Sequence, residues 1–396
     1  MPLRGLLRVA VLLSAGVAFA WPSTIRHNYA SCVTCHADPS GSGLLTDYGR
    51  AQFDLLLRFR PDRVAGAPEP DVNKSAGLLF GALTPPDWLL ASANLRGGAL
   101  LSVGNSVALR PLVMALDVRA QATLLERIVV NGSLGYSIRG GELAALTPTK
   151  DNNLVSREHW VGVKFLDGDL LLRAGRMNLP FGLRNPEHTS WVRTATRTDI
   201  NTGQQHGVAL SYSTDKLRGE VMAVLGNYQL RPDIYRQRGY SAFAEYALQD
   251  NLALGVSSLI TWTQLDPIVR RTLLRQAHGA FVRWVPTPKL VVLSEADVLV
   301  LNPARLPGSE VKDSVGYVAL VQGDLEPVQG LHAMLSLEVL DERRHTLGPS
   351  LGAWATFLFF FAPHTEFRID AIYRHTVAAT GASDGLTLLA QLHLFL

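Results

Sequence analysis

The feature that most constrains this chain is a period-two alternation of apolar and polar residues from Trp88 to the C-terminus. In residues 252–262, 331–340 and 366–374, leucine, valine, isoleucine and aromatic side chains hold most of one set of alternate positions, with Ser258, Ala333 and Ala371 in the others. Successive side chains of a strand point to opposite faces of a sheet, so this period predicts strands with one apolar face. One such segment is typical of any half-buried strand, but the repetition predicts an all-β fold.

Composition narrows the choice of β fold. The 396 residues are 47% apolar and 18% charged, with a mean hydropathy of +0.12. The nearest internal candidate for a membrane helix, Leu351 to Ala362, is shorter than the roughly 20 apolar residues that such a helix needs. These values exclude a disordered chain, a helical transporter and a disulfide-stapled mini-protein. They leave a large soluble β protein or a barrel with an apolar outer wall, and the net charge of +3 gives no reason to expect nucleic acid.

Charged residues on the alternate positions favour the barrel, because they require a wet interior opposite the apolar face. The side chains that we expect to face this lumen are Asp117, Arg119, Glu158, Lys164, Arg173, Arg218, Glu220, Glu245, Arg283, Glu295, Asp297, Glu338, Glu366, Arg368, Asp370 and Arg374. Their signs are mixed, so they predict internal ion pairs rather than a substrate site, and no ion selectivity.

The connections alternate between short and long, as in outer-membrane barrels. Short turns are expected near residues 125–127, 167–169, 214–216, 249–251, 286–288, 324–328 and 362–365. On the other side we expect a short loop at 103–105 and longer ones near 140–155, 178–203, 229–238, 264–272, 302–311, 341–347 and 377–384. This pattern predicts an antiparallel transmembrane barrel of about 16 strands with both ends in the periplasm. The longest loop, 178–203, either folds inward as a constriction or covers the outer mouth.

The N-terminus predicts export. Arg4 and Arg8 precede the apolar run Val9 to Phe19, and Ala18-Phe19-Ala20 fits a small-residue cleavage site. We therefore assign residues 1–20 to a signal peptide and the mature start to Trp21. An N-terminal anchor helix is disfavoured, because the run is too short to span a bilayer.

Both cysteines of the chain lie in one motif, Cys32-Val33-Thr34-Cys35-His36. Cys-x-x-Cys-His is the attachment sequence of c-type haem. Thiols three positions apart can form thioethers to the two vinyl groups of one haem, and His36 then ligates the iron from the proximal side. The motif predicts one covalent haem c held by Cys32, Cys35 and His36.

Three other interpretations of the motif remain. A disulfide suits an oxidising compartment but gives His36 no role. A thioredoxin-like redox pair needs a βαβ context that this segment lacks. A zinc site could recruit His27, although zinc sites usually place their second ligand pair further along the chain.

The sixth position of the iron is left open. No methionine lies between Trp21 and Gly77, so a methionine ligand from this segment is excluded. His27 is the other histidine of the stretch and the candidate sixth ligand. A barrel histidine, a water or an open position are the alternatives.

We divide the mature chain into a monohaem segment (21–63), a linker (64–76) and a barrel (77–396). Within the first segment we expect a glycine-containing loop over Ala37–Arg50 and a short helix over Ala51–Phe59. So small a segment cannot bury a haem alone, and we expect the barrel to supply the other wall. The haem segment then lies in the periplasm or inside the lumen, where Arg173, Arg218 and Arg283 are natural partners for the propionates.

Together the signal peptide, the single Cys-x-x-Cys-His, the glycine-rich tail and the alternating strands resemble the fused cytochrome–porins of Gram-negative outer membranes. The segment Gly175–Leu183 is also similar to a strand-to-loop segment of phosphate-selective-type porins, and residues 388–396 resemble the terminal strand of outer-membrane barrels. The resemblance implies an outer-membrane electron conduit embedded in lipid. Its partners would be a periplasmic electron carrier and an extracellular donor or acceptor. Ferrous iron is the implied donor, which would make the chain an extracellular metal oxidase.

Two functions follow from these observations. The first is the electron conduit, in which the haem passes electrons across the outer membrane. The second is a diffusion porin for small solutes, with the haem segment as plug, sensor or tether. A haem at the end of a pore has little use in passive diffusion, which favours the conduit.

Overall fold

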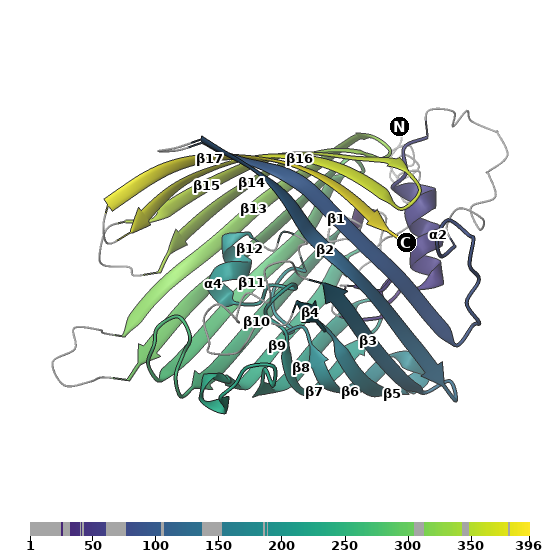
Figure 1. Ribbon diagram of the computed structural model, residues 1–396, viewed down its shortest axis with the longest axis horizontal. Coiled ribbons are helices and arrows are strands. Elements are labelled where there is room, and N and C mark those ends of the chain that lie inside the picture. Colours follow the sequence, from purple (N-terminus) through teal and green to yellow (C-terminus); the bar gives the residue numbers. More distant parts are fainter. Residues whose placement is uncertain are drawn as a thin grey trace, which may run out of the picture.

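A computed structural model describes residues 25–26, 32–39, 41, 43–60, 77–103, 107–136, 153–184, 187, 189–304, 313–342, 348–378 and 381–396. The predicted signal peptide, His27 and the linker 64–76 lie outside these residues. In the described part, no helix is both long and apolar enough to cross a membrane. The strands instead form one tilted, closed sheet (Figure 1).

The first nine strands are β1 (Leu89–Val103), β2 (Val107–Leu124), β3 (Ile128–Tyr136), β4 (Leu154–Val155), β5 (His159–Phe165), β6 (Leu170–Met177), β7 (Gln205–Ser213), β8 (Leu217–Gly226) and β9 (Arg238–Gln249). The others are β10 (Leu252–Thr263), β11 (Leu273–Thr287), β12 (Leu290–Pro303), β13 (Ser314–Val328), β14 (Leu331–Asp341), β15 (Ser350–Ala362), β16 (Thr365–Ala378) and β17 (Gly381–Phe395). The helices are α2 (Asp47–Leu56) and α4 (Trp191–Thr196), with single 3-10 turns at Leu166–Gly168 and Asp233–Tyr235.

The sheet closes on itself. Each strand pairs antiparallel with its neighbours in the sequence, and β1 pairs with both β2 and β17. Since β4 and β5 both pair with β3, they are two pieces of one strand interrupted at residues 156–158. The described residues therefore form a 16-strand antiparallel barrel, which confirms the predicted fold class.

The two faces follow the predicted alternation. On β10, Leu254, Val256 and Trp262 are exposed on the outside, whereas Ala253, Ser257, Leu259 and Thr261 are buried. The charged side chains predicted to face the lumen share the parity of the inward residues of their strands. Glu158, which lies between β4 and β5, is also buried. The middle of the outer wall is therefore apolar, and most charges of the strands face the interior. A charged group on the outward face lies at the loop end of the sheet, where Asp384 of β17 binds Tyr373 and His375 of β16.

The structure corrects three local predictions. A turn was expected over residues 324–328, but β13 continues to Val328 and the turn follows at residues 329–330. A long loop was expected over 377–384, but β16 and β17 pair as far as Ala378 and Gly381. The helix begins at Asp47 rather than Ala51, because Thr46 caps it by accepting a hydrogen bond from the Gly49 backbone N–H at 3.0 Å.

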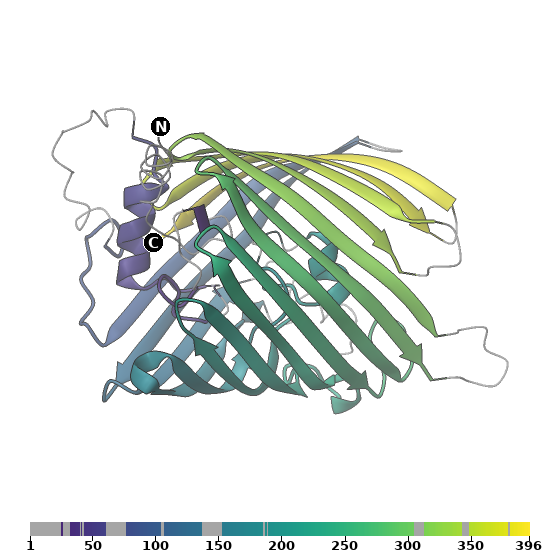
Figure 2. The same ribbon diagram turned by 180° about the vertical axis from the view of Figure 1, so that it is seen from behind.

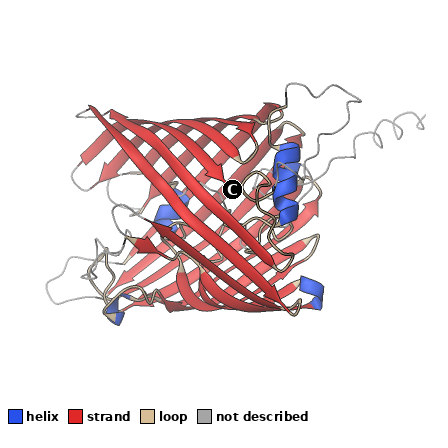
Figure 3. Ribbon diagram, turned by 45° about the vertical axis from the view of Figure 1, so that its right-hand side comes forward, coloured by secondary structure: helices blue, strands red, loops and turns tan. Residues whose placement is uncertain are grey.

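Helix α2 lies at the short-turn end of the barrel, close to the C-terminus (Figure 1). The view from behind shows the same placement (Figure 2). Helix α4, by contrast, lies within the barrel outline (Figure 1), and the turned view shows the strands, in red, forming the wall around the interior (Figure 3). The N-terminal segment thus meets the barrel at the end predicted to face the periplasm.

The outward face predicts where a charge is tolerated. Val256, 59% exposed in the middle of β10, should lie in the hydrocarbon layer, so Val256→Arg should cost about 2–4 kcal/mol of folding free energy. Val107→Arg, at the loop end of β2, is the matched control and should cost about 0–1 kcal/mol. Urea unfolding in phospholipid bilayers measures both. Equal stability of the two variants would contradict the assigned lipid face.

Candidate functional site in the barrel lumen

The Cys-x-x-Cys-His motif folds into a single helical turn. The backbone N–H groups of Cys35 and His36 both donate to the Cys32 carbonyl, at 3.2 and 2.9 Å. Both thiols are buried, and they are not joined in a disulfide. A turn of this kind places residues three apart on one side. Its donor set, two thiols followed directly by an imidazole, is the one that covalent haem attachment requires, and attachment itself stays a prediction.

The turn lies against inward-facing arginines of the barrel. Arg218 of β8 approaches Cys32 with 2.7 Å between its Nη1 and the Sγ atom. Arg173 of β6 forms an ion pair with Asp38 at 3.0 Å. Both arginines are buried, so residues 32–38 lie inside the lumen. Two of the three arginines that the sequence suggested as haem partners therefore contact this segment directly.

Arg283 is connected to the same cluster through Glu245. It pairs with one carboxylate oxygen of Glu245. The other oxygen, Oε2, lies 2.6 Å from Arg218 Nη2. Arg173 likewise pairs with Glu220 at 2.6 Å. The buried arginines are thus neutralised by carboxylates of neighbouring strands, as buried charges require.

Two glycines let the chain pass close to the cysteines. Gly41 has a φ of +81°, and a Cβ there would lie 2.8 Å from Cys32 Sγ. At Gly49, on the first turn of α2, a Cβ would lie 2.3 Å from the Cys35 carbonyl oxygen. Any larger residue would push the loop or the helix away from the motif.

Arg26 anchors the chain before the motif and was missed by the sequence analysis. Its guanidinium binds Asp324 and Glu326 of β13, both at 2.7 Å, and the Arg26 side chain is 2% exposed. The sequence placed Asp324 in a turn, which hid its inward position. His332 completes the cluster, with 2.9 Å between its Nδ1 and Asp324 Oδ1.

After the motif, α2 packs on the rim of the barrel. Phe53 contacts Phe360 of β15 and Phe395 of β17 edge to face, with ring centroids 5.1 and 4.4 Å apart. The Phe59 N–H donates to the Phe360 carbonyl at 2.8 Å. Phe395 points inward, as the sequence indicated, and its ring packs against Phe53 of α2.

The described parts of the N-terminal segment therefore contact the barrel at several places around the short-turn end. It contacts β13 through Arg26, β8 through Cys32, β6 through Asp38, and β15 and β17 through Phe53. These contacts place described residues of the segment at one end of the lumen.

The long connection between β6 and β7 folds inward, which decides between the two positions considered for residues 178–203. Its helix α4 donates from the Trp191 N–H to Glu338 of β14 at 2.6 Å. Arg193 of the same helix pairs with Glu295 of β12, and both side chains are almost fully buried. The Leu183 N–H donates to the other Glu295 oxygen at 2.9 Å. The connection is thus held against the opposite wall and narrows the lumen.

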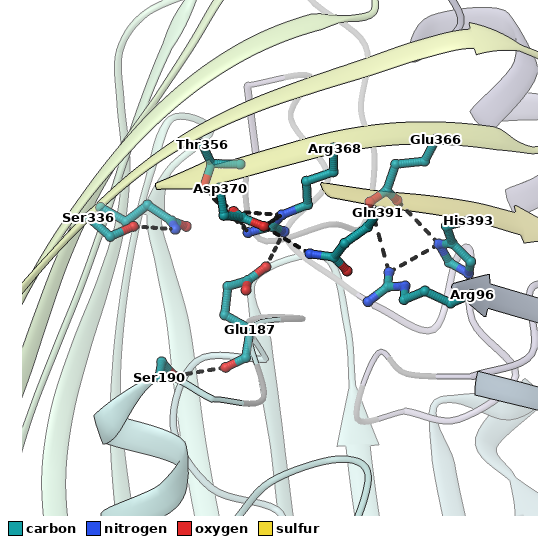
Figure 4. Close-up of polar contacts among 11 residues, drawn as sticks. Arg96, Glu187, Ser190, Ser336, Thr356, Glu366, Arg368, Asp370, Gln391 and His393 are labelled. Atoms are coloured by element: carbon teal, nitrogen blue, oxygen red, sulfur yellow. Dashed lines mark hydrogen bonds and ion pairs between the residues drawn. The ribbon is translucent and has the colours of Figure 1, made fainter. Parts of the chain in front are cut away.

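A second anchor of this connection lies on β16 (Figure 4). Glu187 points toward Arg368, which it binds, and Arg368 also binds Asp370 at 2.7 Å. Gln391 of β17 donates to Asp370 at 2.8 Å. Polar and charged residues of the connection, β16 and β17 thus form one network between the inward connection and the wall.

A third anchor lies among the outer loops. Arg197, just after α4, binds Asp266 at 2.5 Å. Burial would raise the pKa of the Asp266 carboxyl, but Arg197 and the backbone N–H groups of Ile268 and Val269 outweigh it and keep that pKa below its ordinary value. The carboxylate therefore stays charged and keeps its hold on Arg197 at neutral and mildly acidic pH.

No protein-family model matches this sequence, and no curated protein matches it. The fold is similar to solved structures. OmpT, an outer membrane protein of Vibrio cholerae, matches with a TM-score of 0.57 at 9% identity, over 80% of this chain and 100% of that one. The outer membrane channel DcaP of Acinetobacter baumannii gives 0.55 at 11%, over 77% and 97%. An anion-selective porin from Comamonas acidovorans gives 0.56 at 8%, over 78% and 99%. The chain has the porin-like β-barrel fold of outer membrane proteins.

The Arg193–Glu295 pair predicts how tightly the inward connection is held. Arg193→Ala leaves Glu295 buried without its cation, which should cost about 3–5 kcal/mol and release the connection from β12. Single-channel conductance in planar bilayers should rise. Arg193→Ala/Glu295→Ala removes the stranded carboxylate, so it should regain stability while keeping the higher conductance. Wild-type conductance in both variants would show that the pair does not hold the connection.

Proposed function

We propose that this chain is an outer-membrane channel of the porin type, through which small solutes pass between the outside and the periplasm. The observation that carries the proposal is a closed 16-strand barrel with an apolar outer wall and a charged, narrowed lumen. Its likeness to a channel and to an anion-selective porin supports the same function.

The N-terminal segment is the regulator of this channel in our proposal. Its path along the inner wall occupies the short-turn end, and the Arg26 ion pairs with Asp324 and Glu326 tie it to β13. A solute must pass between this segment and the wall, or the segment must move. We therefore propose a plugged rather than a freely open porin.

Conductance tests both parts of the proposal. Purified wild-type protein should form channels in planar bilayers, and Arg26→Gln should raise their conductance because the segment loses its tie to β13. Arg238→Gln is the matched control, since Arg238 forms an exposed pair with Asp233 at 3.6 Å. Absence of channels in wild type and Arg26→Gln alike would reject the diffusion channel.

A second candidate function rests on the motif turn inside the lumen. We propose that Cys32 and Cys35 attach a haem and that His36 ligates its iron; His27 stays a candidate for the sixth position. When bound, haem c supplies a one-electron redox centre. The chain's own residues would enclose it: α2 covers the turn, while Arg173 and Arg218 surround the cysteines.

In that case the barrel is an electron conduit. A periplasmic carrier would approach from the short-turn end, where α2 lies, and an extracellular donor such as ferrous iron would enter from the long-loop side. This reading shares the barrel and the plug with the first candidate. The two differ in whether the N-terminal segment carries a cofactor.

Haem attachment has a direct test. Denatured wild-type protein from outer membranes should stain for covalent haem, and Cys32→Ala/Cys35→Ala should lose the stain. The variant should still migrate as a heat-modifiable barrel, because the turn is held by Asp38 and Arg26 as well as by the cysteines. A wild-type protein without covalent haem rejects the conduit and leaves the diffusion channel.

A further inference from the structure

Arg184 on the inward connection carries a buried charge that the protein only partly satisfies. It is 7% exposed, and its Nη2 donates to the Leu179 carbonyl. Within the described residues, its Nε and Nη1 atoms are buried and have no hydrogen-bond partner. Burying a cation costs several kcal/mol unless it is paired, so this position is suited to an anion.

The surroundings place Arg184 beside the motif turn. Leu183 packs in one apolar cluster with Ile25 of the N-terminal segment and Phe243 of β9. Arg218, which contacts Cys32, lies over the Phe243 ring at 5.4 Å from its centroid. The Glu220 and Asp38 carboxylates, which bind Arg173 beside the turn, also act electrostatically on Arg184. Burial lowers the pKa of Arg184 to about 10, which leaves the guanidinium charged at neutral pH.

The arginines around Cys32 differ in how they are paired. Arg173 binds Asp38 and Glu220, while Arg218 and Arg283 bind Glu245. Within the described residues, Arg184 forms no ion pair with these carboxylates. A carboxylate at Arg184 would neutralise its buried charge.

We propose that Arg184 binds a propionate carboxylate of a haem attached at Cys32 and Cys35, so that the inward connection helps to hold the cofactor. This inference rests on the proposed haem attachment. A haem c carries two propionates, and guanidinium groups bind carboxylates through strong charge-assisted hydrogen bonds. The other arginines near the turn already bind protein carboxylates, which leaves Arg184 as the natural partner. The same residue would then link the pore constriction to the haem.

The test is the midpoint potential of the haem in purified full-length protein, measured by spectroelectrochemistry. A cation next to the haem favours the reduced state, so Arg184→Met should shift the potential to a more negative value. Arg184→Lys keeps a cation at this position, so its midpoint potential should stay close to the wild-type value. Arg275→Met is the matched control: Arg275 is buried at the opposite end of β11 from Arg283 and donates to Thr196 and Gln237. It should keep the wild-type potential.

Folding is checked in the Cys32→Ala/Cys35→Ala background. There Arg184→Met should leave the heat-modification temperature unchanged or raise it, because it removes a buried charge that lacks its ligand. Haem-bearing Arg184→Met with the wild-type potential would overturn the inference and leave haem attachment standing. Wild-type protein without haem would overturn both. An Arg184-dependent block of channel current by acetate in the haem-bearing protein would assign the site to a solute instead.

Discussion

Closure of the sheet is the constraint on which the rest of this structure depends. A bilayer offers no partner for a backbone N–H or carbonyl, so every strand must pair on both edges. The pairing of β1 with β17, from Asn94 opposite Phe395 to Val103 opposite Leu386, completes that requirement. Closure also divides the side chains into an outer and an inner set. The outer set must be apolar, and the inner set is free to carry charge.

The charged inner face in turn explains how two segments of irregular structure are held inside the barrel. The inward connection and the N-terminal segment each reach the wall through arginine–carboxylate pairs. Arg193 with Glu295, Arg26 with Asp324, and Arg173 with Asp38 join residues far apart in the sequence. These pairs are shielded from water, so they fix positions that exposed pairs would not. The lumen is thus a polar core as well as a passage.

Both candidate functions use this arrangement. A diffusion channel needs the narrowed, charged lumen, and an electron conduit needs a redox group placed within it. The turn Cys32–His36 lies inside the lumen, the position that both candidate functions require of the N-terminal segment. The glycines at 41 and 49 allow the turn to lie close to both its own loop and α2. The arginines around it bind protein carboxylates, Arg173 with Asp38 and Glu220 and Arg218 with Glu245.

Sequence alone was sufficient for the strands, because alternation of side chains is a local property of a strand. Leu254 and Val256 on the outside, and Glu245 and Arg283 on the inside, could be assigned from their parity. Prediction failed where pairing with a distant segment decided the outcome. The register of β16 with β17 shortened an expected loop, and the cap at Thr46 moved the start of a helix.

The motif at Cys32–His36 and the chemistry of its residues are likewise determined by the sequence. The position of the motif within the barrel is not determined by the sequence. Only the tertiary structure placed Arg218 beside Cys32, Arg26 beside Asp324 and residues 178–203 across the lumen. Each of these contacts joins residues more than 100 positions apart, and no local pattern reports which inward charge meets which. The physical reason is that barrel closure brings the inner face of every strand into one enclosed space, where partners are chosen by distance and charge rather than by sequence order.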